Sequence, residues 1–454
     1  MTLDLLRFTT AGSVDDGKST LIGRLLYDTK QVFEDQLEHV AEASMRRGGE
    51  GVLDLALLTD GLRAEREQGI TIDVAYRYFA TARRRFIIAD CPGHQQYTRN
   101  MVTGASTADL AVILLDARKG VLEQSKRHAF ISVLLGIPHL VVAVNKMDLV
   151  DYSRARFEEL VGEFESFAQK LSAMPGVPMG SALDLEGERR AGPEVTYIPI
   201  SALEGDNVVD RSQRMDWYQD PARQPVLLEL LEEVDVAYDH PYDRPARFPV
   251  QWVIRPAQAR STVPAPAAAL SEDYRGYAGQ LASGALRVGE DVVALPSGQR
   301  TRIAAIDTYE GTLEEALAPM SVTLRLEDEL DVSRGELICR PEQSPTVARE
   351  LRADVCWLNA RPLRPGARYV IKHTTRSATA IVDALEDRVD VHTLERAPAP
   401  AELELNDIGS VRLRTSAPLA FDPYVGNRRT GSFILIDEAT NETVGAGMVA
   451  SATG

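Results

Sequence analysis

Residues 12–19 read "GSVDDGKS", and this stretch decides the fold. It has the spacing G-x-x-x-x-G-K-[ST] of a phosphate-binding loop. An apolar strand pattern at residues 5–12 precedes it, and a helical pattern at residues 19–28 follows it. In such a loop the glycines let backbone N–H groups close around phosphate oxygens, and the helix N-terminus adds a favourable dipole. We therefore predict a strand–loop–helix unit that binds a nucleotide.

Strand and helix patterns alternate on both sides of this loop throughout the first half of the chain. The strand patterns lie at residues 5–12, 85–91, 110–117, 139–146 and 195–201. The helical patterns, with apolar residues recurring every three or four positions, include residues 124–136 and 154–171. This alternation predicts an α/β domain with a mostly parallel sheet wrapped by helices.

The second half of the chain has a different pattern. Prolines cluster at residues 239–245, and short alternating runs with glycine or proline turns follow, as in a small antiparallel barrel. A second proline-marked junction precedes another strand-rich block from about residue 351 to residue 449. We predict domains at residues 1–240, 241–346 and 347–454, and a surface insertion rich in alanine and proline at residues 257–273.

The phosphate loop assigns roles to its polar residues. Lys18 is expected to neutralise the β- and γ-phosphates, and the Ser19 hydroxyl is expected to ligate Mg²⁺. The nucleotide contacts predicted in this segment are Gly12, Ser13, Val14, Asp15, Asp16, Gly17, Lys18, Ser19 and Thr20.

The stretch "VVAVNKMDLV" at residues 141–150 distinguishes GTP from ATP. At a strand end Asp148 can accept both N1–H and the exocyclic N2–H of guanine, a donor pair that adenine lacks. Asn145 would hold the loop and reach the base, and the Lys146 stem can lie along the base face. The backbone around Ser201 and Ala202 can donate to guanine O6. The predicted base contacts are Asn145, Lys146, Met147, Asp148, Ser201, Ala202 and Leu203.

Residues 86–94, "FIIADCPGH", admit three interpretations: an ordinary turn, half of a zinc site, or part of the nucleotide machinery. Asp90 can hold a water on Mg²⁺, the Gly93 N–H can bond the γ-phosphate, and His94 stands where a residue must orient the attacking water. Zinc is disfavoured because no Cys-x-x-Cys pair accompanies Cys91. The predicted GTP contacts here are Asp90, Cys91, Pro92, Gly93 and His94.

The remaining γ-phosphate contact is assigned to "AEREQGITIDVAYRYF" at residues 64–79. The Thr71 hydroxyl could complete the Mg²⁺ shell while its backbone N–H touches the phosphate. A loop of this kind orders with GTP and relaxes after hydrolysis. The predicted metal ligands are thus Ser19, Thr71 and Asp90.

Composition narrows the class of protein. The 454 residues carry a formal net charge of −17, which argues against broad nonspecific nucleic-acid binding. Three scattered cysteines suit a reducing compartment, and no apolar run reaches the roughly 20 residues of a membrane helix. We expect a cytoplasmic protein without a signal peptide, and we interpret the basic cluster Arg83–Arg85 as a solvated hairpin turn.

Together these motifs resemble the translational GTPase family typified by elongation factor Tu. The segments "GSVDDGKST", "EREQGITID", "DCPGHQQYTRNMVTGAS", "NKMDLV" and "ISAL" fall in its order and spacing. The resemblance implies a nucleotide domain followed by two antiparallel β-barrels. It also implies that His94 orients the attacking water while Val14 and Ile70 gate it.

A closer resemblance, from Phe8 to Val449, is to the large GTP-hydrolysing subunits of bacterial two-subunit sulfate adenylyltransferases. It is carried by "RGYAGQLASGALRVGEDVVALPSG", "VTLRLEDELDVSRGELI" and "TVGAGMV", and the insertion at 257–273 departs from it. It implies that GTP hydrolysis is coupled to forming adenylylsulfate and pyrophosphate from ATP and sulfate. No Ser-Gly-Gly-x-Asp-Ser loop is present, so we expect a smaller, ATP-pyrophosphatase-like partner subunit to handle ATP and sulfate, in a heterodimer or higher assembly. An adenylylsulfate kinase activity is not expected.

Two other functions stay open. An elongation factor carrying aminoacyl-tRNA would have the same fold and GTP site, and only the barrel sequences argue against it. A purely regulatory GTP switch would hydrolyse GTP at a rate that ATP and sulfate cannot alter.

Overall fold

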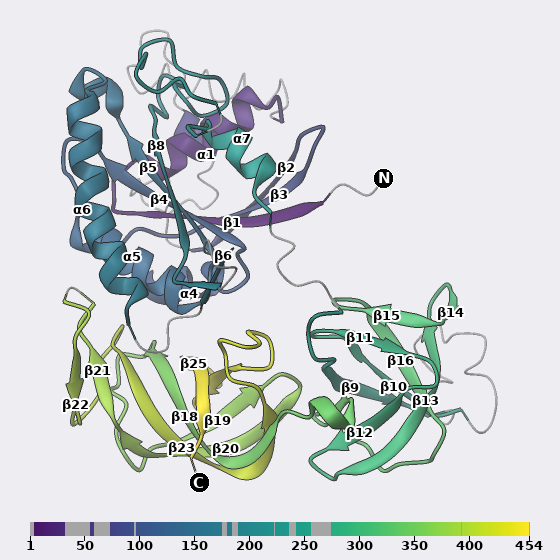
Figure 1. Cartoon of the computed structure of the whole chain (residues 1–454). Coiled ribbons are helices and arrows are strands. Elements are labelled where there is room, and N and C mark those ends of the chain that lie inside the picture. Colours follow the sequence, from purple (N-terminus) through teal and green to yellow (C-terminus); the bar gives the residue numbers. More distant parts are fainter. Residues whose placement is uncertain are drawn as a thin grey trace. The chain divides into compact units, whose positions relative to one another are not determined.

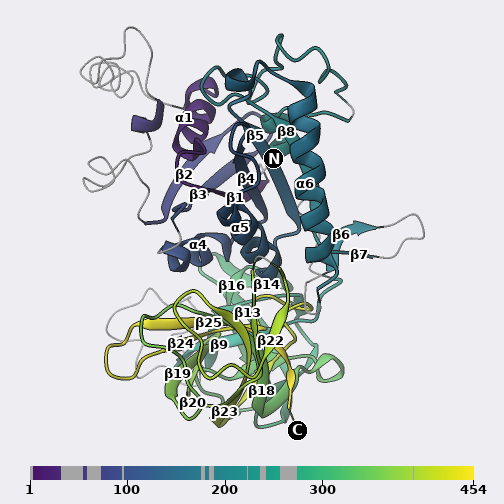
Figure 2. The ribbon, with the colours of Figure 1, turned by 90° about the vertical axis from the view of Figure 1, so that its left-hand side faces the viewer.

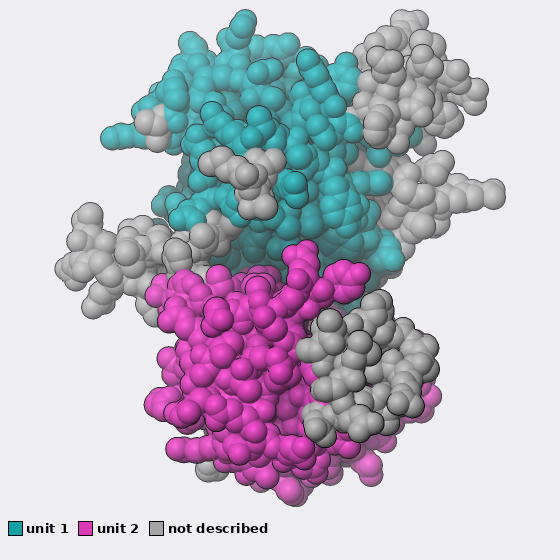
Figure 3. Space-filling model, turned by 90° about the vertical axis from the view of Figure 1, so that its right-hand side faces the viewer, with its two compact units in different colours: residues 1–236, 391–394 teal, residues 237–390, 395–454 magenta. Residues whose placement is uncertain are grey.

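The computed structural model describes residues 4–31, 55–58, 73–94, 97–174, 179–183, 189–221, 223–235, 242–255, 274–391 and 393–453. The chain divides into two compact units, which are coloured separately in Figure 3. Unit 1 comprises residues 1–236 and 391–394, and unit 2 comprises residues 237–390 and 395–454. Each unit is described by itself.

Unit 1 is built on a six-stranded sheet with the strand order β2-β3-β1-β4-β5-β8. Only the edge strand β2 runs antiparallel to its neighbour. Every residue of the adjacent interior strands β4 and β5 is buried, as their continuous apolar sequences predict. The strands are β1 (Leu5–Gly12), β2 (Ala75–Ala80), β3 (Arg85–Asp90), β4 (Leu110–Asp116), β5 (His139–Asn145) and β8 (Glu194–Pro199).

Helices cover both faces of this sheet, with α1 and α7 on one side and α4, α5 and α6 on the other (Figure 1). Ser153 caps the N-terminus of helix α6, and its side chain accepts a hydrogen bond from the backbone N–H of Arg156. A separate ribbon of β6 (Met179–Leu183) and β7 (Arg189–Ala191) lies beside the end of α6 (Figure 2). The helices are α1 (Lys18–Asp28), α4 (Thr98–Ala105), α5 (Glu123–Leu134), α6 (Arg154–Ser172) and α7 (Leu227–Glu233), with 3₁₀ turns η1 (Leu55–Leu58) and η3 (Met147–Val150).

The basic cluster Arg83–Arg85 lies at the β2–β3 hairpin, but it is not uniformly solvated. Arg84 is buried, and its guanidinium donates to the carbonyl oxygens of Leu231 and Val234 at 3.1 and 2.6 Å. It also pairs with Asp4 at 2.6 Å. The prediction of a wholly solvated turn is wrong at this position, because the arginine caps the C-terminal end of α7, where free carbonyls attract a cation.

Unit 2 contains two antiparallel barrels, each closed by six strands. In the first, pairing of β12 with β13 closes the order β12-β17-β9-β10-β16-β13; in the second, pairing of β18 with β23 closes β18-β25-β24-β19-β20-β23. The first barrel uses β9 (Phe248–Ile254), β10 (Gly276–Gln280), β12 (Asp291–Leu295), β13 (Gln299–Thr308), β16 (Ser321–Leu326) and β17 (Leu337–Cys339). The second uses β18 (Thr346–Trp357), β19 (Arg368–His373), β20 (Arg376–Leu385), β23 (Ile408–Phe421), β24 (Ser432–Ile436) and β25 (Thr443–Ala452).

Five short strands and one 3₁₀ turn complete the barrels beside those closing strands. These strands take part in three local pairs, β11 with β15, β13 with β14, and β21 with β22. Their bounds are β11 (Ala285–Arg287), β14 (Gly311–Leu313), β15 (Glu315–Leu317), β21 (Asp387–Val389), β22 (Arg396–Pro398) and η5 (Pro341–Gln343).

A buried ion pair joins the two barrels. Arg247 is 2% exposed, and its Nε and one terminal nitrogen each lie 2.8 Å from an oxygen of Asp422. The Asp422 carboxylate also accepts from the Thr430 hydroxyl at 2.5 Å. This two-pronged geometry offsets much of the cost of burying the charges and fixes how the barrels meet.

The predicted α/β domain followed by two β-barrels is confirmed. The alanine- and proline-rich segment predicted as an insertion lies outside the described residues. Among the helices that the structure describes, none combines the length and apolar character that a bilayer crossing requires.

Candidate functional site

The predicted motifs meet at one edge of the sheet in unit 1. The phosphate loop follows β1, the Asp90–His94 segment follows β3, the Asn-Lys-Met-Asp stretch follows β5, and Ser201 follows β8. These strands run parallel, so their carboxyl ends lie along the same edge, which is where open α/β sheets bind ligands. Residues separated by almost 200 positions in the chain thus become neighbours.

The phosphate loop depends on Gly17, the residue before α1. Its φ of 97° lies in the left-handed region, which a residue with a Cβ adopts only with strain. A Cβ there would lie 2.4 Å from Nδ2 of Asn145. Within the loop, the Asp16 carboxylate accepts from the backbone N–H of Ser13 at 2.7 Å. The loop is thus held in shape by its own side chains and by the guanine motif.

Lys18 is buried inside the loop, with 7% of its surface exposed. Its ammonium donates to the carbonyl oxygens of Gly12 and Ser13 at 3.0 and 2.9 Å. Burial lowers the pKa of Lys18, and the charges of Asp90 and Asp16 oppose that shift. The Lys18 ammonium is therefore held against the loop carbonyls, beside the place where phosphate oxygens are expected.

The segment after β3 packs its backbone directly against the phosphate loop. A Cβ on Gly93 would lie 2.5 Å from both the Gly12 carbonyl oxygen and the Lys18 ammonium. Asp90 is 3% exposed, and one of its oxygens accepts from the Thr10 hydroxyl at 3.1 Å. Position 93 therefore needs a glycine. The Asp90 carboxylate is held in a fixed orientation beside the phosphate loop.

Cys91 turns its side chain away from this edge and into the core. The thiol is fully buried and lies 3.0 Å from the Thr9 hydroxyl. Burial raises the pKa of Cys91 to about 12, so the group is a neutral thiol. Only its backbone is available to a nucleotide.

The guanine motif is tied to the loops on either side of it. Asn145 donates through Nδ2 to the Asp16 carbonyl at 2.7 Å and accepts through Oδ1 from the Ala202 N–H at 2.9 Å. Asp148 accepts from the Ser201 hydroxyl at 2.6 Å. The structure thus brings together the phosphate loop, Asn145, Asp148 and the Ser201–Ala202 turn as the sequence predicts.

The predicted catalytic residues are placed only in part. His94 is exposed beside Gly93, and its ring centroid lies 6.1 Å from that of Tyr97. Val14 is half-buried in the phosphate loop. Ile70 and Thr71 lie outside the described residues.

Two residues at this edge were missed from the sequence. Asp116 ends β4 and is paired with Lys146 at 3.0 Å. Arg24 of α1 donates through Nε to the Ala202 carbonyl at 3.2 Å and also bonds the Leu203 carbonyl. A carboxylate that ends a wholly apolar strand is the same pattern that singled out Asp90, so Asp116 could have been found; nothing in the sequence points to Arg24.

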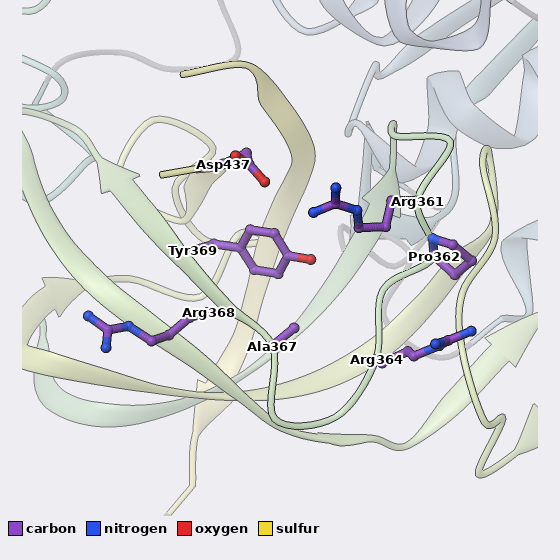
Figure 4. A pocket seen from close by; sticks show the side chains of 7 residues that line it. All are labelled: Arg361, Pro362, Arg364, Ala367, Arg368, Tyr369 and Asp437. Carbon is purple, nitrogen blue, oxygen red and sulfur yellow. The ribbon is translucent and has the colours of Figure 1, made fainter. Parts of the chain in front are cut away.

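The second barrel contains a cavity of about 320 Å³ that is separate from this set of residues. Its lining includes Arg364 and Arg368, whose guanidinium groups point away from each other (Figure 4). They pair with Glu402 and Glu438 at 2.7 and 3.8 Å. The polar ends of Arg361, Tyr369 and Asp437 face one another in this cavity (Figure 4), but none of the predicted site residues lines it.

Comparison with known proteins identifies the family. The family described as "Elongation factor Tu GTP binding domain" matches residues 3–239, and "GTP-eEF1A C-terminal domain-like" matches residues 350–450. "Sulfate adenylyltransferase subunit 1" of Vibrio parahaemolyticus serotype O3:K6 is 51% identical over 446 residues, covering 98% of this chain and 86% of the relative. The chain belongs to the sulfate adenylyltransferase subunit 1 family of elongation factor Tu-like GTP-binding proteins.

Other known proteins are also similar to this chain. The protein of Bacteroides fragilis (strain YCH46) is 49% identical, covering 98% of this chain and 86% of the relative. "Bifunctional enzyme CysN/CysC" of Mycobacterium tuberculosis (strain CDC 1551 / Oshkosh) is 53% identical, and the alignment covers 98% of this chain and 67% of that enzyme. The solved structure of sup35 complexed with GDP covers 100% of this chain and 95% of its own, with 23% identity and a TM-score of 0.42. Both resemblances predicted from the sequence are confirmed, and unit 1 contains a GTP-binding domain.

Proposed function

We propose that this chain is the GTP-hydrolysing subunit of a two-subunit sulfate adenylyltransferase and that a smaller subunit carries out the adenylylation. One observation carries the proposal: Lys18, Asn145 and Asp148 are assembled at one sheet edge in a chain that is about half identical to relatives named sulfate adenylyltransferase subunit 1. The same relatives disfavour an elongation factor. We retain domain limits of 1–240, 241–346 and 347–454 as part of this proposal.

GTP is proposed to bind across the whole edge. The backbone N–H groups of the phosphate loop and the Lys18 ammonium hold the phosphates, because fixed donors and one buried cation favour a polyanion. Asp148 takes the two guanine donors, and the Ser201 hydroxyl bonded to it orients the carboxylate. The contacts of Asn145 with both neighbouring loops keep base and phosphate sites at a fixed spacing.

Mg²⁺ is proposed to be held by Ser19 and Asp90, together with Thr71. The donors present suit it, because hydroxyl and carboxylate oxygens are the ligands that Mg²⁺ prefers, and the Asp90 carboxylate is already oriented by Thr10. When bound, Mg²⁺ neutralises charge on the β- and γ-phosphate oxygens.

Hydrolysis is assigned to His94, with Val14 and Ile70 limiting access of water. His94 follows Gly93, whose backbone packs against Gly12 and Lys18, so the imidazole is anchored one residue from the phosphate site. An imidazole in that place can accept a hydrogen bond from a water molecule, which directs a lone pair of the water oxygen toward phosphorus. GTP hydrolysis must be coupled to sulfate adenylylation because a phosphosulfate anhydride is unstable. Its formation from ATP and sulfate alone is therefore strongly unfavourable.

Replacing Asp148 by asparagine should reverse the base preference. The change exchanges one acceptor for a donor at the guanine edge, where xanthine has a carbonyl in place of the amino group. We expect the affinity for GTP to fall about 10- to 100-fold relative to that for xanthosine triphosphate, the scale of lost hydrogen bonds to a charged group. Competition binding with both nucleotides measures the ratio, and an equal loss of both would show that Asp148 does not read the base.

A further inference from the structure

Asp116 stands next to the guanine motif and has no part in the function proposed above. It is the last residue of β4, and the register pairs it with Asn145, the last residue of β5. The backbone N–H of Ala117 donates to the Asn145 carbonyl at 2.9 Å. A carboxylate is thus placed at the end of a wholly buried strand, opposite the residue that precedes Lys146.

Four donors converge on the Asp116 carboxylate, whose side chain is 0% exposed. Arg118 supplies three of them, its backbone N–H at 2.9 Å, Nε at 3.0 Å and a terminal nitrogen at 2.7 Å. Lys146 supplies the fourth at 3.0 Å. Burial alone would raise the pKa of Asp116, but these hydrogen bonds outweigh burial and hold it well below its usual range. The group is therefore an anion at neutral pH.

Lys146 connects this anion to the phosphate loop. Its backbone has a φ of 63°, in the left-handed region, where a lysine is held only if its surroundings fix it. Its ammonium donates to the Asp15 carbonyl oxygen as well as to Asp116. Because Asn145 holds the Asp16 carbonyl, two consecutive carbonyls of the phosphate loop are fixed by two consecutive residues of the guanine motif.

We propose that Asp116 is a positioning residue for guanine nucleotide binding, which acts by anchoring the Lys146 ammonium between β4 and the phosphate loop. With that anchor, the lysine stem stays extended along the place where the guanine face is expected. Without the Asp116 anchor, the Lys146 ammonium is free to leave the phosphate loop. The guanine motif is then joined to that loop by the Asn145 hydrogen bond and no longer by Lys146 as well. Asp116 thus governs how tightly nucleotide is held and leaves the hydrolytic step to other residues.

Asp116→Asn tests this role with little change in side-chain size. We expect Kd and KM for GTP and the dissociation rate of a fluorescent GDP to rise about tenfold, as for a lost charged hydrogen bond, while kcat changes less than about twofold. Asp109→Asn is the matched control at the opposite end of β4, where the carboxylate accepts from the Arg7 N–H at 2.9 Å. The control should leave all these constants unchanged.

A double-mutant cycle shows whether Asp116 acts through Lys146. Lys146→Met alone should weaken GTP, and adding Asp116→Asn to it should cost no further affinity, because the anchored group is already gone. Two results would overturn the proposal. In the first, the double variant loses affinity by the product of the two single losses. In the second, a folded Asp116→Asn variant binds GTP within about twofold of the unchanged chain. If Asp116→Asn does not fold, Lys146→Met alone decides, and an unchanged affinity in that variant contradicts the link.

This inference rests on the proposed GTP contacts, so binding of GTP by the unchanged chain is measured first. If that chain does not bind GTP, the proposed function is wrong and this inference falls with it. If it binds GTP but Asp116→Asn binds equally well, only the role of Asp116 is wrong.

Discussion

Replacing Lys18 by methionine should strongly slow GTP hydrolysis and also weaken GTP binding. The ammonium is the one cation buried within the described phosphate loop, and it already points at loop carbonyls that flank the phosphate site. Removing a preorganised charge from such a site costs about 10²- to 10³-fold in rate. Loss of the charged contacts should also lower the affinity for GTP by about 10- to 100-fold, the order expected for hydrogen bonds to phosphate. Hydrolysis at saturating GTP and titration of a fluorescent analogue measure the two effects separately.

Lys126→Met is the matched control for this change. Lys126 lies in the same unit on α5, is partly exposed, and pairs with Glu163 at 3.6 Å. It should bind and hydrolyse GTP as the unchanged chain does. Melting of the nucleotide-free proteins checks folding, and a folded Lys18→Met variant with normal hydrolysis would remove the phosphate loop from the proposed site.

His94→Ala should slow GTP hydrolysis without changing GTP binding. The side chain is exposed and its removal leaves no cavity in the core, so folding and GTP affinity should be preserved. Hydrolysis should slow by about 10²- to 10⁴-fold, the scale of a positioned group that orients or deprotonates water. Single-turnover hydrolysis of bound GTP gives this rate without interference from product release.

His94→Gln provides the second variant for this position. An amide can accept a hydrogen bond from water but cannot take up its proton, so an intermediate rate would assign His94 to orientation, and a rate equal to that of the alanine variant would assign it to proton transfer. An unchanged rate in His94→Ala would remove His94 from the mechanism.

Much of the fold could be predicted because burial and sequence pattern coincide. The continuous apolar runs of β4 and β5 require cover on both faces, which only a helix-wrapped parallel sheet supplies. Closure of the barrels depends on pairing of distant strands, such as Thr346 with Phe421. Arg84 shows where pattern fails: three adjacent arginines look alike in sequence, but only the tertiary position of the α7 carbonyls buries the middle one.

The site was predictable to the extent that short motifs encode it. The phosphate loop, Asp90, Asn145 and Asp148 each belong to a stretch with a fixed spacing, and the topology brings those stretches together. The links between the stretches were not predictable. The Asp116–Lys146 pair joins residues 30 positions apart through side chains, and the contact of Gly17 with Asn145 depends on how two loops meet.

The most direct test of the account is pyrophosphate release from ATP and sulfate by this chain combined with a candidate smaller subunit of the ATP-pyrophosphatase type. We expect sustained release with GTP, little release with a nonhydrolysable GTP analogue, and little release when Lys18→Met replaces the unchanged chain. Full release without GTP, or formation of adenylylsulfate at full rate by this chain alone, would contradict it.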